Sequence, residues 1–227
     1  MTLRATIFDL DGLLVDSETL WHRAEVEILG ARGVPVTKHE DRATKGMFVE
    51  EVVRYWHGRY PWSPPALDDV VAQLLTRVGD LVEQSGRLLP GAERALDLAS
   101  ERGPIALASS TPMALIERML DHFDLRDRFA VIRSAEDEPF GKPHPGVFLS
   151  AASDLDVDPP VCLVLEDSAA GVIAAKAARM AVVAVPVAAE RNQAPFALAD
   201  LRLDSLVDLS STWLDQRFAP AGPSTLA

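Results

Sequence analysis

Cysteine and positively charged residues are both scarce in this chain of 227 residues. Cys162 is the single cysteine, so the chain cannot form an internal disulfide, which is compatible with a reducing compartment. Its place in the apolar run 161–165 predicts a packed strand residue and not a nucleophile. The 22 lysines and arginines are outnumbered by 34 acidic residues, for a net charge of −12. Such an acidic chain has little to pair with phosphate backbones, so we expect it to bind neither nucleic acid nor anionic membranes.

Long apolar runs and internal repeats are also missing. No stretch approaches the roughly 20 apolar residues that a membrane-spanning helix needs. The first residues lead directly into a predicted strand followed by two acids, so we expect no signal peptide and a soluble, cytoplasmic protein. Hydrophobic residues still make up 48% of the chain, which supports a substantial core and excludes a wholly disordered chain.

Asp9, Asp11 and Gly12 directly follow the first predicted strand, residues 5–8, whose β-branched and aromatic members are typical of a buried parallel strand. Gly12 permits a sharp turn at this point. Because ligands of open parallel sheets bind outside the carboxyl ends of the strands, the two acids are well placed for chemistry. A solvated acidic turn is the alternative for these residues taken alone.

The next stretch of the chain shows only helical periodicity. Apolar residues recur at helical spacing between Ser17 and Gly33, over 49–57 and over 67–84, and prolines and glycines separate the three segments. This stretch lies between one strand and a set of later strands. We therefore predict a helical cap over residues 17–87, a core formed by 1–16 and 88–227, and a disordered tail over 219–227.

The rest of the chain alternates between strand and helix patterns. Strands are predicted over 104–108, 129–133, 161–165 and 181–185, with a short edge strand over 201–203, and helices over 92–101, 112–122, 146–152, 169–178 and 206–218. In the second of these helices, Pro112 is expected at the first helical position, with Ser110 or Thr111 as the N-cap. This alternation predicts an α/β fold, a Rossmann-like parallel sheet covered by helices on both faces.

Polar groups also follow later strands. Ser109 and Ser110 lie at a strand end that begins a helix, where hydroxyls and free N–H groups bind an anion or simply cap the helix. Lys142 is held in a Gly-Lys-Pro loop, a suitable position for meeting a phosphate. Glu166 and Asp167 are again two acids at a strand terminus.

Four acids are then expected at one edge of the sheet, namely Asp9, Asp11, Glu166 and Asp167. Two like charges about 4 Å apart cost on the order of 4 kcal/mol at moderate dielectric, so a cation must compensate them. Mg²⁺ with oxygen ligands, together with Lys142, meets this need, and no Cys/His cluster suggests zinc. Since Mg²⁺ commonly bridges carboxylates and phosphate oxygens, the sequence predicts a phosphoryl-transfer site.

These motifs, in this order, resemble those of the haloacid dehalogenase superfamily, in the subfamily with a helical cap inserted after the first strand. The matching residues are Asp9-Leu10-Asp11-Gly12, Ser109, Lys142 and Glu166-Asp167, and the resemblance covers essentially the whole chain. Residues 11–18 and 163–168 are most similar to the sugar-phosphate branch, which includes the 2-deoxyglucose-6-phosphate (hexitol) phosphatases and β-phosphoglucomutase. The resemblance implies a Mg²⁺-dependent phosphatase that hydrolyses a small sugar-phosphate monoester.

The same resemblance implies a role for each motif. Asp9 is expected to attack phosphorus and form an aspartyl-phosphate, and Asp11 to protonate the leaving oxygen and then activate water. The expected ligands of Mg²⁺ are Asp9, the Asp11 backbone carbonyl, Asp167 and, through water, Glu166, and the expected ligands of the phosphoryl oxygens are Ser109, Ser110 and Lys142.

The cap is expected to close over the site and to contribute substrate specificity. The candidates for sugar contacts are Glu18, Trp21, Lys45 and Arg77, with ordinary packing and surface charge as the alternative. The mutases carry a histidine where this chain has Trp21, and an arginine where it has Val49. His22, one position later, is expected to point elsewhere on its helix. Losing both mutase residues removes the means of holding a bisphosphate, so water is the expected acceptor.

Two other functions remain as alternatives. One is a phosphosugar mutase of the β-phosphoglucomutase type. The other, from a different class, is a non-catalytic phospho-accepting domain or sugar-phosphate binder. A phospho-accepting domain would need neither Asp11 nor a helical cap, and the sequence provides both. We expect a monomer that acts on a small sugar phosphate.

Overall fold

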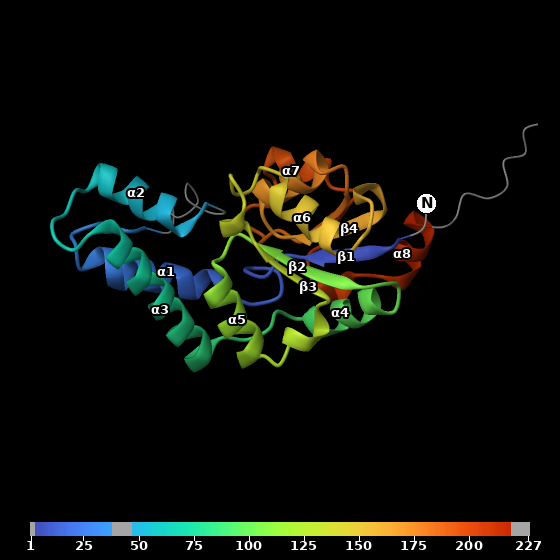
Figure 1. Ribbon diagram of the computed structural model, residues 1–227, viewed down its shortest axis with the longest axis horizontal. Helices are drawn as coiled ribbons and strands as arrows, with labels where there is room; N and C mark the ends of the chain where they lie inside the picture. Colours follow the sequence, from blue (N-terminus) through green and yellow to red (C-terminus); the bar gives the residue numbers. More distant parts are fainter. Residues whose placement is uncertain (1–2, 38–46, 219–227) are drawn as a thin grey trace, which may run out of the picture.

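A six-stranded parallel sheet forms the centre of the protein in a computed structural model that describes residues 3–37 and 47–218 (Figure 1). The strands are β1 Ala5–Phe8, β2 Ile105–Ser109, β3 Val131–Ser134, β4 Cys162–Glu166, β5 Ala181–Ala184 and β6 Leu201–Arg202. Their order is β3-β2-β1-β4-β5-β6, so the winding direction reverses at β1. This arrangement confirms the predicted Rossmann-like sheet, and the reversal marks the crevice where ligands of such sheets bind.

Alternate residues of each strand face opposite layers of helices, as the two-residue period of a strand requires. Ile7 and Val164 pack with α6 (Gly146–Asp154) and α7 (Ala169–Ala177), and Phe8 belongs to the other core. That second core includes α4 (Ala92–Ser100) and α5 (Met113–His122). Figure 1 shows the two helical layers on either side of the sheet. Burial on both faces explains why β1, β2, β4 and β5 read as nearly continuous apolar runs.

Three helices lie beyond the end toward which β1 runs (Figure 1). They are α1 Glu18–Gly30, α2 Val49–Arg59 and α3 Leu67–Ser85. Each presents one apolar stripe to the others, and Trp56 of α2 is fully buried among them. Tyr60-Pro61 ends α2 and Gly86 ends α3, as proline and glycine commonly do. In the described ranges, no helix is both long and apolar enough to cross a bilayer.

Several predicted boundaries are wrong by a few residues. Helix α5 begins at Met113, with Pro112 at the N-cap position. The Thr111 hydroxyl bonds Asp11 and does not cap the helix, and the Met113 N–H donates to the Glu136 carboxylate at 3.0 Å. The predicted helix 206–218 is a 3₁₀ turn at Leu206–Asp208 followed by α8 Ser211–Arg217. Further 3₁₀ turns lie at Arg126–Arg128, Ala135–Asp137, Pro159–Val161 and Ala194–Leu198. The predicted tail over 219–227 lies outside the described residues.

Cys162 confirms the sequence prediction for the single cysteine. Its side chain is completely buried in β4, and burial raises the pKa of the thiol to about 11. A thiol in that state is a small apolar packing group and not a nucleophile.

Candidate active site

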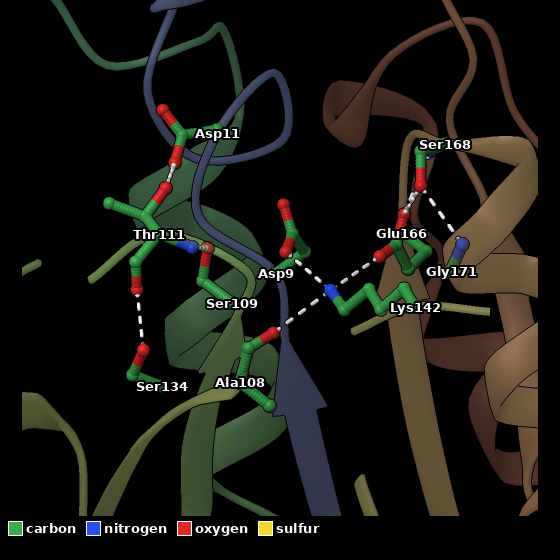
Figure 2. A network of polar contacts seen from close by, with 10 residues as sticks. All are labelled: Asp9, Asp11, Ala108, Ser109, Thr111, Ser134, Lys142, Glu166, Ser168 and Gly171. Atoms are coloured by element: carbon green, nitrogen blue, oxygen red, sulfur yellow. Dashed lines mark hydrogen bonds and ion pairs between the residues drawn. The ribbon is translucent and has the colours of Figure 1, made fainter. Parts of the chain in front are cut away.

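Lys142 joins two of the predicted acids at the carboxyl edge of the sheet. Its Nζ lies 2.6 Å from Asp9 Oδ1 and 2.7 Å from Glu166 Oε1, and it donates to the Ala108 carbonyl at 3.1 Å (Figure 2). The three protons of the ammonium therefore have three acceptors. These groups come from the ends of β1, β2 and β4, which pair in register, so the sheet itself brings them together.

Glu166 is held in place by the start of α7. Its Oε2 accepts hydrogen bonds from the Ser168 backbone N–H at 2.8 Å and the Ser168 hydroxyl at 2.9 Å. The Ser168 hydroxyl in turn accepts from the Gly171 N–H at 3.0 Å, as an N-cap does. A Cβ at position 171 would overlap the Glu166 carboxylate, so the close approach requires glycine there. Glu166 thus connects the N-cap residue of α7, Ser168, to Lys142.

The charges at this edge do not balance. Asp9, Glu166 and Asp167 are all buried, and Lys142 is the ammonium among them. Burial lowers the pKa of Lys142, but the charges of Asp9 and Glu166 outweigh this and raise that pKa above its ordinary value. Burial raises the pKa of Asp9 well above its ordinary value; Lys142 opposes the rise, and Glu166 and Asp167 add to it. Lys142 therefore stays charged, and burial, reinforced by the neighbouring carboxylates, raises the pKa of Asp9.

A divalent cation fits this surplus of negative charge. Gly12 has a φ of +76°, and a Cβ there would lie 2.5 Å from Asp167 Oδ2, so Asp167 lies directly against the turn after β1. Asp9 and Asp167 are the carboxylates at this edge that could hold a divalent ion. Both oxygens of Glu166 already accept hydrogen bonds, so Glu166 supports the site and does not bind a metal ion directly in this arrangement. In residues 3–37 and 47–218, no three His, Cys, Asp or Glu side chains converge as a metal site. The four acids expected around one cation therefore do not form a single cluster in these ranges, because Asp11 is bonded elsewhere.

Asp11 is held by three donors and lies apart from the Lys142 cluster. Its Oδ1 accepts from the Ser17 hydroxyl at 2.6 Å and the Trp21 indole N–H at 2.9 Å, and its Oδ2 accepts from the Thr111 hydroxyl at 2.6 Å. Figure 2 shows the Asp11 carboxylate directed at Thr111 and not at Asp9. The two acids of the first motif therefore have separate surroundings.

Ser109 and Ser110, the predicted phosphate ligands, lie between the end of β2 and the start of α5. The Thr111 N–H donates to Ser109 Oγ at 3.2 Å, and the Ser134 hydroxyl donates to the Thr111 carbonyl at 2.7 Å, which fixes the loop. Ser110 Oγ is buried and has no hydrogen-bond partner within the described part of the chain. Both serines line the cavity described below, so the Ser110 hydroxyl remains available to a ligand.

Comparison with known proteins identifies the family. Residues 3–179 match the family of haloacid dehalogenase-like hydrolases. The chain belongs to this family. It is 44% identical to hexitol phosphatase B of Escherichia coli K12 over 209 residues, which cover 91% of this chain and 94% of the relative. The structure of CbbY from Rhodobacter sphaeroides, in complex with phosphate, is similar with a TM-score of 0.82 at 29% identity, covering 92% and 97% of the two chains. β-Phosphoglucomutase from Clostridium difficile also gives 0.82, at 26% identity and with 96% and 97% covered.

A cavity of about 540 Å³ lies between the motif residues of this hydrolase and the helices α1, α2 and α3, which correspond to the predicted cap. Asp9, Asp11, Lys142 and Asp167 line the core side. The cap side is lined by the polar residues Glu18, Trp21, His22 and Glu25 and by the aliphatic residues Val49, Val52 and Leu74. Trp21 and His22 both border the cavity at this turn of α1, and only the Trp21 indole is bonded to Asp11 among the contacts described here.

The other two cap candidates have different outcomes. Arg77 does not line the cavity; its guanidinium bonds the Glu27 carboxylate at 2.6 and 3.2 Å, across α1 and α3. This pair is exposed, so the geometry gives Arg77 no sugar contact. Lys45 lies outside the described residues.

Some cavity residues were not predicted from the sequence. Ser17 and Ser168 are hydroxyl residues at helix N-termini, and that position is the signal that could have indicated them. Thr111 was predicted only as an N-cap candidate. Val187 and Glu190 line the cavity from the loop after β5, and nothing in their local sequence distinguishes them.

Proposed function

We propose that this hydrolase removes phosphate from a small sugar-phosphate monoester, with water as the acceptor. The observation that carries the proposal is the buried junction of Lys142 with Asp9 and Glu166, which opens on a cavity large enough for a small sugar phosphate. The 44% identity to hexitol phosphatase B over most of both chains supports a hexitol phosphate as the first substrate to test.

Asp9 is proposed as the nucleophile. Lys142 occupies one of its oxygens, and Figure 2 shows the second oxygen directed away from Lys142. Attack of this oxygen on phosphorus, with departure of the sugar oxygen, leaves an aspartyl-phosphate. Lys142 and the hydroxyls of Ser109 and Ser110 are placed to hold the charged phosphoryl oxygens, which is the main contribution that a protein makes to this chemistry.

Asp11 is proposed as the acid and base. In an in-line displacement the leaving oxygen lies on the far side of phosphorus from Asp9, toward the cap. Asp11 borders that part of the cavity, because two of its three donors, Ser17 and Trp21, lie at the start of the cap helix α1. It can therefore give a proton to the leaving sugar and later take one from the attacking water.

Mg²⁺ is the proposed cofactor, held by Asp9, Asp167 and the Asp11 carbonyl. When bound, it neutralises charge on the transferring phosphoryl group. The surplus of buried carboxylates described above is the reason to expect it, and Glu166 would keep its place behind these residues by bonding to Ser168 and Lys142.

A mutase is less compatible with the cavity. A mutase must also hold a second phosphate, yet Lys142 is the one lysine or arginine that lines the cavity in residues 3–37 and 47–218. Val49 and Val52 present aliphatic surface on the cap side, which cannot pair with a phosphate. Residues 17–87 are proposed to act as the cap, and the cytoplasm, compatible with the single buried thiol, is the proposed compartment.

The test is phosphate release from a panel of hexitol, hexose and deoxyhexose phosphates with Mg²⁺, repeated with a chelator. We expect multiple turnovers with Mg²⁺ and none with the chelator. Asp9→Asn should lower kcat by about 10³-fold or more, with an unchanged circular dichroism spectrum, because an amide is a poor nucleophile. Sustained turnover by Asp9→Asn would refute the nucleophile, and glucose-bisphosphate-dependent isomerisation without net phosphate release would favour the mutase.

A further inference from the structure

We infer that Phe48 is a positioning residue that holds the proposed cap closed over the bound substrate by packing on Gly141. This inference rests on the proposed function, in which a sugar phosphate occupies the cavity. Phe48 lies at the N-cap position of α2, and Gly141 directly precedes Lys142. A Cβ at position 141 would lie 3.0–3.2 Å from three atoms of the Phe48 ring, closer than side chains normally pack. The ring therefore lies directly on the glycine.

This contact lies at the edge of the cavity. Met47 and Val49 flank Phe48 in the chain, and both line the cavity. Lys142 lines it as well. The Phe48 side chain is half-buried and packs instead against the apolar core between the sheet and helices α6 and α7. Its backbone N–H donates to the Glu51 carboxylate at 3.1 Å, which fixes the start of α2. The ring thus joins the cap wall of the cavity to the loop that carries Lys142.

The cap has a second, broader attachment on the side of α5. Helices α3 and α5 pack together and share one continuous apolar cluster (Figure 1). Arg118 of α5 also bonds three acceptors on one face of α3, namely Glu83, Asp80 and the Thr76 carbonyl, at 2.6, 2.8 and 3.3 Å. A Cβ at position 79 would overlap the Arg118 guanidinium, so Gly79 allows the arginine to lie along α3. Separating α3 from α5 would break these bonds and expose the shared cluster.

The two attachments therefore differ in the free energy that separation requires. In residues 17–37 and 47–87, Phe48 is the one apolar residue that packs against the α6 and α7 core. Because the hydrophobic free energy scales with the apolar area removed from water, the Phe48 contact separates more readily than the α3–α5 contact. Opening of the cavity for a substrate thus begins at Phe48, with α3 and α5 as the pivot. Return of the ring to Gly141 closes the cavity beside Lys142 and retains the sugar.

The experiment changes the fit between positions 48 and 141 from both sides. Gly141→Ala adds a methyl against the ring, and the backbone accepts it because the φ of Gly141 is not positive. Phe48→Leu shortens the opposing side chain. We expect each single substitution to lower kcat/KM for the preferred sugar phosphate of the panel by about tenfold. The double variant should recover to within about threefold of wild type, because the smaller side chain leaves room for the methyl.

A second measurement separates closure of the cap from support of the Lys142 loop. Inorganic phosphate is expected to bind to Lys142 and the serines of the core, so its inhibition constant should change by less than about twofold in Phe48→Leu. KM for the sugar phosphate should rise by about threefold or more, because an open cap no longer retains the sugar.

Phe140→Leu is the matched control, because it makes the same change one residue before Gly141. The Phe140 ring is 65% exposed, lies near His144 with 5.5 Å between the ring centroids, and does not line the cavity. Phe140→Leu should leave kcat/KM within about twofold of wild type and should not rescue Gly141→Ala.

Four results would overturn the inference. Losses that multiply in the double variant would show that the two residues do not act through one contact. Unchanged kcat/KM in Phe48→Leu would show that the contact is irrelevant, and phosphate inhibition weakened as much as KM rises would show that Phe48 only supports the core loop. Rescue by Phe140→Leu would show that the effect is not specific to Phe48. Failure of the wild type to release phosphate from any sugar phosphate is a separate outcome, which would overturn the proposed function itself and the inference with it.

Discussion

At the carboxyl edge of the sheet, the side chains of Lys142, Asp9 and Glu166 are only 3%, 8% and 1% exposed, whereas those of Arg77 and Glu27 on the cap are 24% and 37% exposed. Charges in water are screened, and a single exposed pair contributes little to stability. Charges removed from water interact strongly, and each becomes costly when its partner is lost. The core edge therefore concentrates the chemistry, while ion pairs on the outside of the cap can change without consequence for it.

Replacing Lys142 gives the largest expected contrast between the two regions. In Lys142→Met, Asp9 and Glu166 lose their shared cation inside the protein, so we expect a free energy of unfolding lower by about 3–5 kcal/mol and kcat lower by about 10³-fold. Urea denaturation and phosphate release measure the two effects. Lys176→Met is the matched control, because Lys176 bonds Asp200 at 2.8 Å with 33% of its side chain exposed. Its cost should stay within about 1 kcal/mol.

The loss in free energy of unfolding caused by Lys142→Met should depend on pH. The pKa of Asp9 is raised in the folded protein, so this group favours folding below its unfolded pKa and opposes folding as the pH rises above it. This loss should therefore be larger at pH 7 than at pH 5 in the presence of a chelator, and Mg²⁺ should reduce it. The contrast between buried and exposed ion pairs would be contradicted by a loss in stability that does not change with pH. It would also be contradicted if Lys142→Met and Lys176→Met lost the same free energy of unfolding.

Replacing Gly171 gives an intermediate effect at the same edge. In Gly171→Ala, the added methyl overlaps the Glu166 carboxylate and displaces it from Ser168 and Lys142. We expect a melting temperature lower by several degrees, equivalent to about 1–3 kcal/mol, and kcat lower by about tenfold. Gly58→Ala, on the cap helix α2, should instead stabilise slightly, because nothing lies within 4 Å of its new Cβ. A neutral result at position 171 would mean that Glu166 need not be held so closely.

The smallest effect is expected at Arg77. In Arg77→Gln, kcat and KM should remain within about twofold of wild type, because the guanidinium bonds Glu27 outside the cavity. The arginine side chains of Arg77 and Arg23 lower the pKa of Glu27 from 4.5 to about 2. The pair therefore stabilises the fold above pH 4.5, and this contribution is lost as the pH falls toward 2. NMR titration of Glu27 in the variant should show its pKa returning toward 4.5, whereas a large rise in KM would restore a substrate role for Arg77.

Much of the fold followed from local patterns. The apolar run before Asp9 and the alternation of strand and helix after residue 88 predict a parallel sheet, because strands buried on both faces must be apolar throughout. Asp9, Lys142 and Glu166 were predicted to meet because the carboxyl ends of parallel strands share one edge. The register of β1 with β2 and β4 then places these groups within hydrogen-bond distance.

Contacts that depend on the direction of a side chain could not be predicted. Trp21 was predicted as a candidate sugar contact, and the structure shows in addition that its indole N–H bonds Asp11 at the cavity wall. Helical periodicity gives the angle between residues of one helix but not which helix or turn lies opposite them. The Pro112 boundary was wrong for a related reason, because Thr111 bonds Asp11 across 100 residues of sequence and does not cap its own helix.

The sequence by itself determined the chemistry, since the residue types and their order after the strands specify acids, a lysine and hydroxyls at one edge of a sheet. Only the tertiary structure decided how those groups are oriented. The Trp21 bond to Asp11, the Ser168 support of Glu166 and the position of Glu190 on the cavity wall arise where separate elements meet. The physical reason is that hydrophobic periodicity encodes which face of an element is buried, whereas hydrogen-bond geometry between elements depends on packing distances that no local pattern contains.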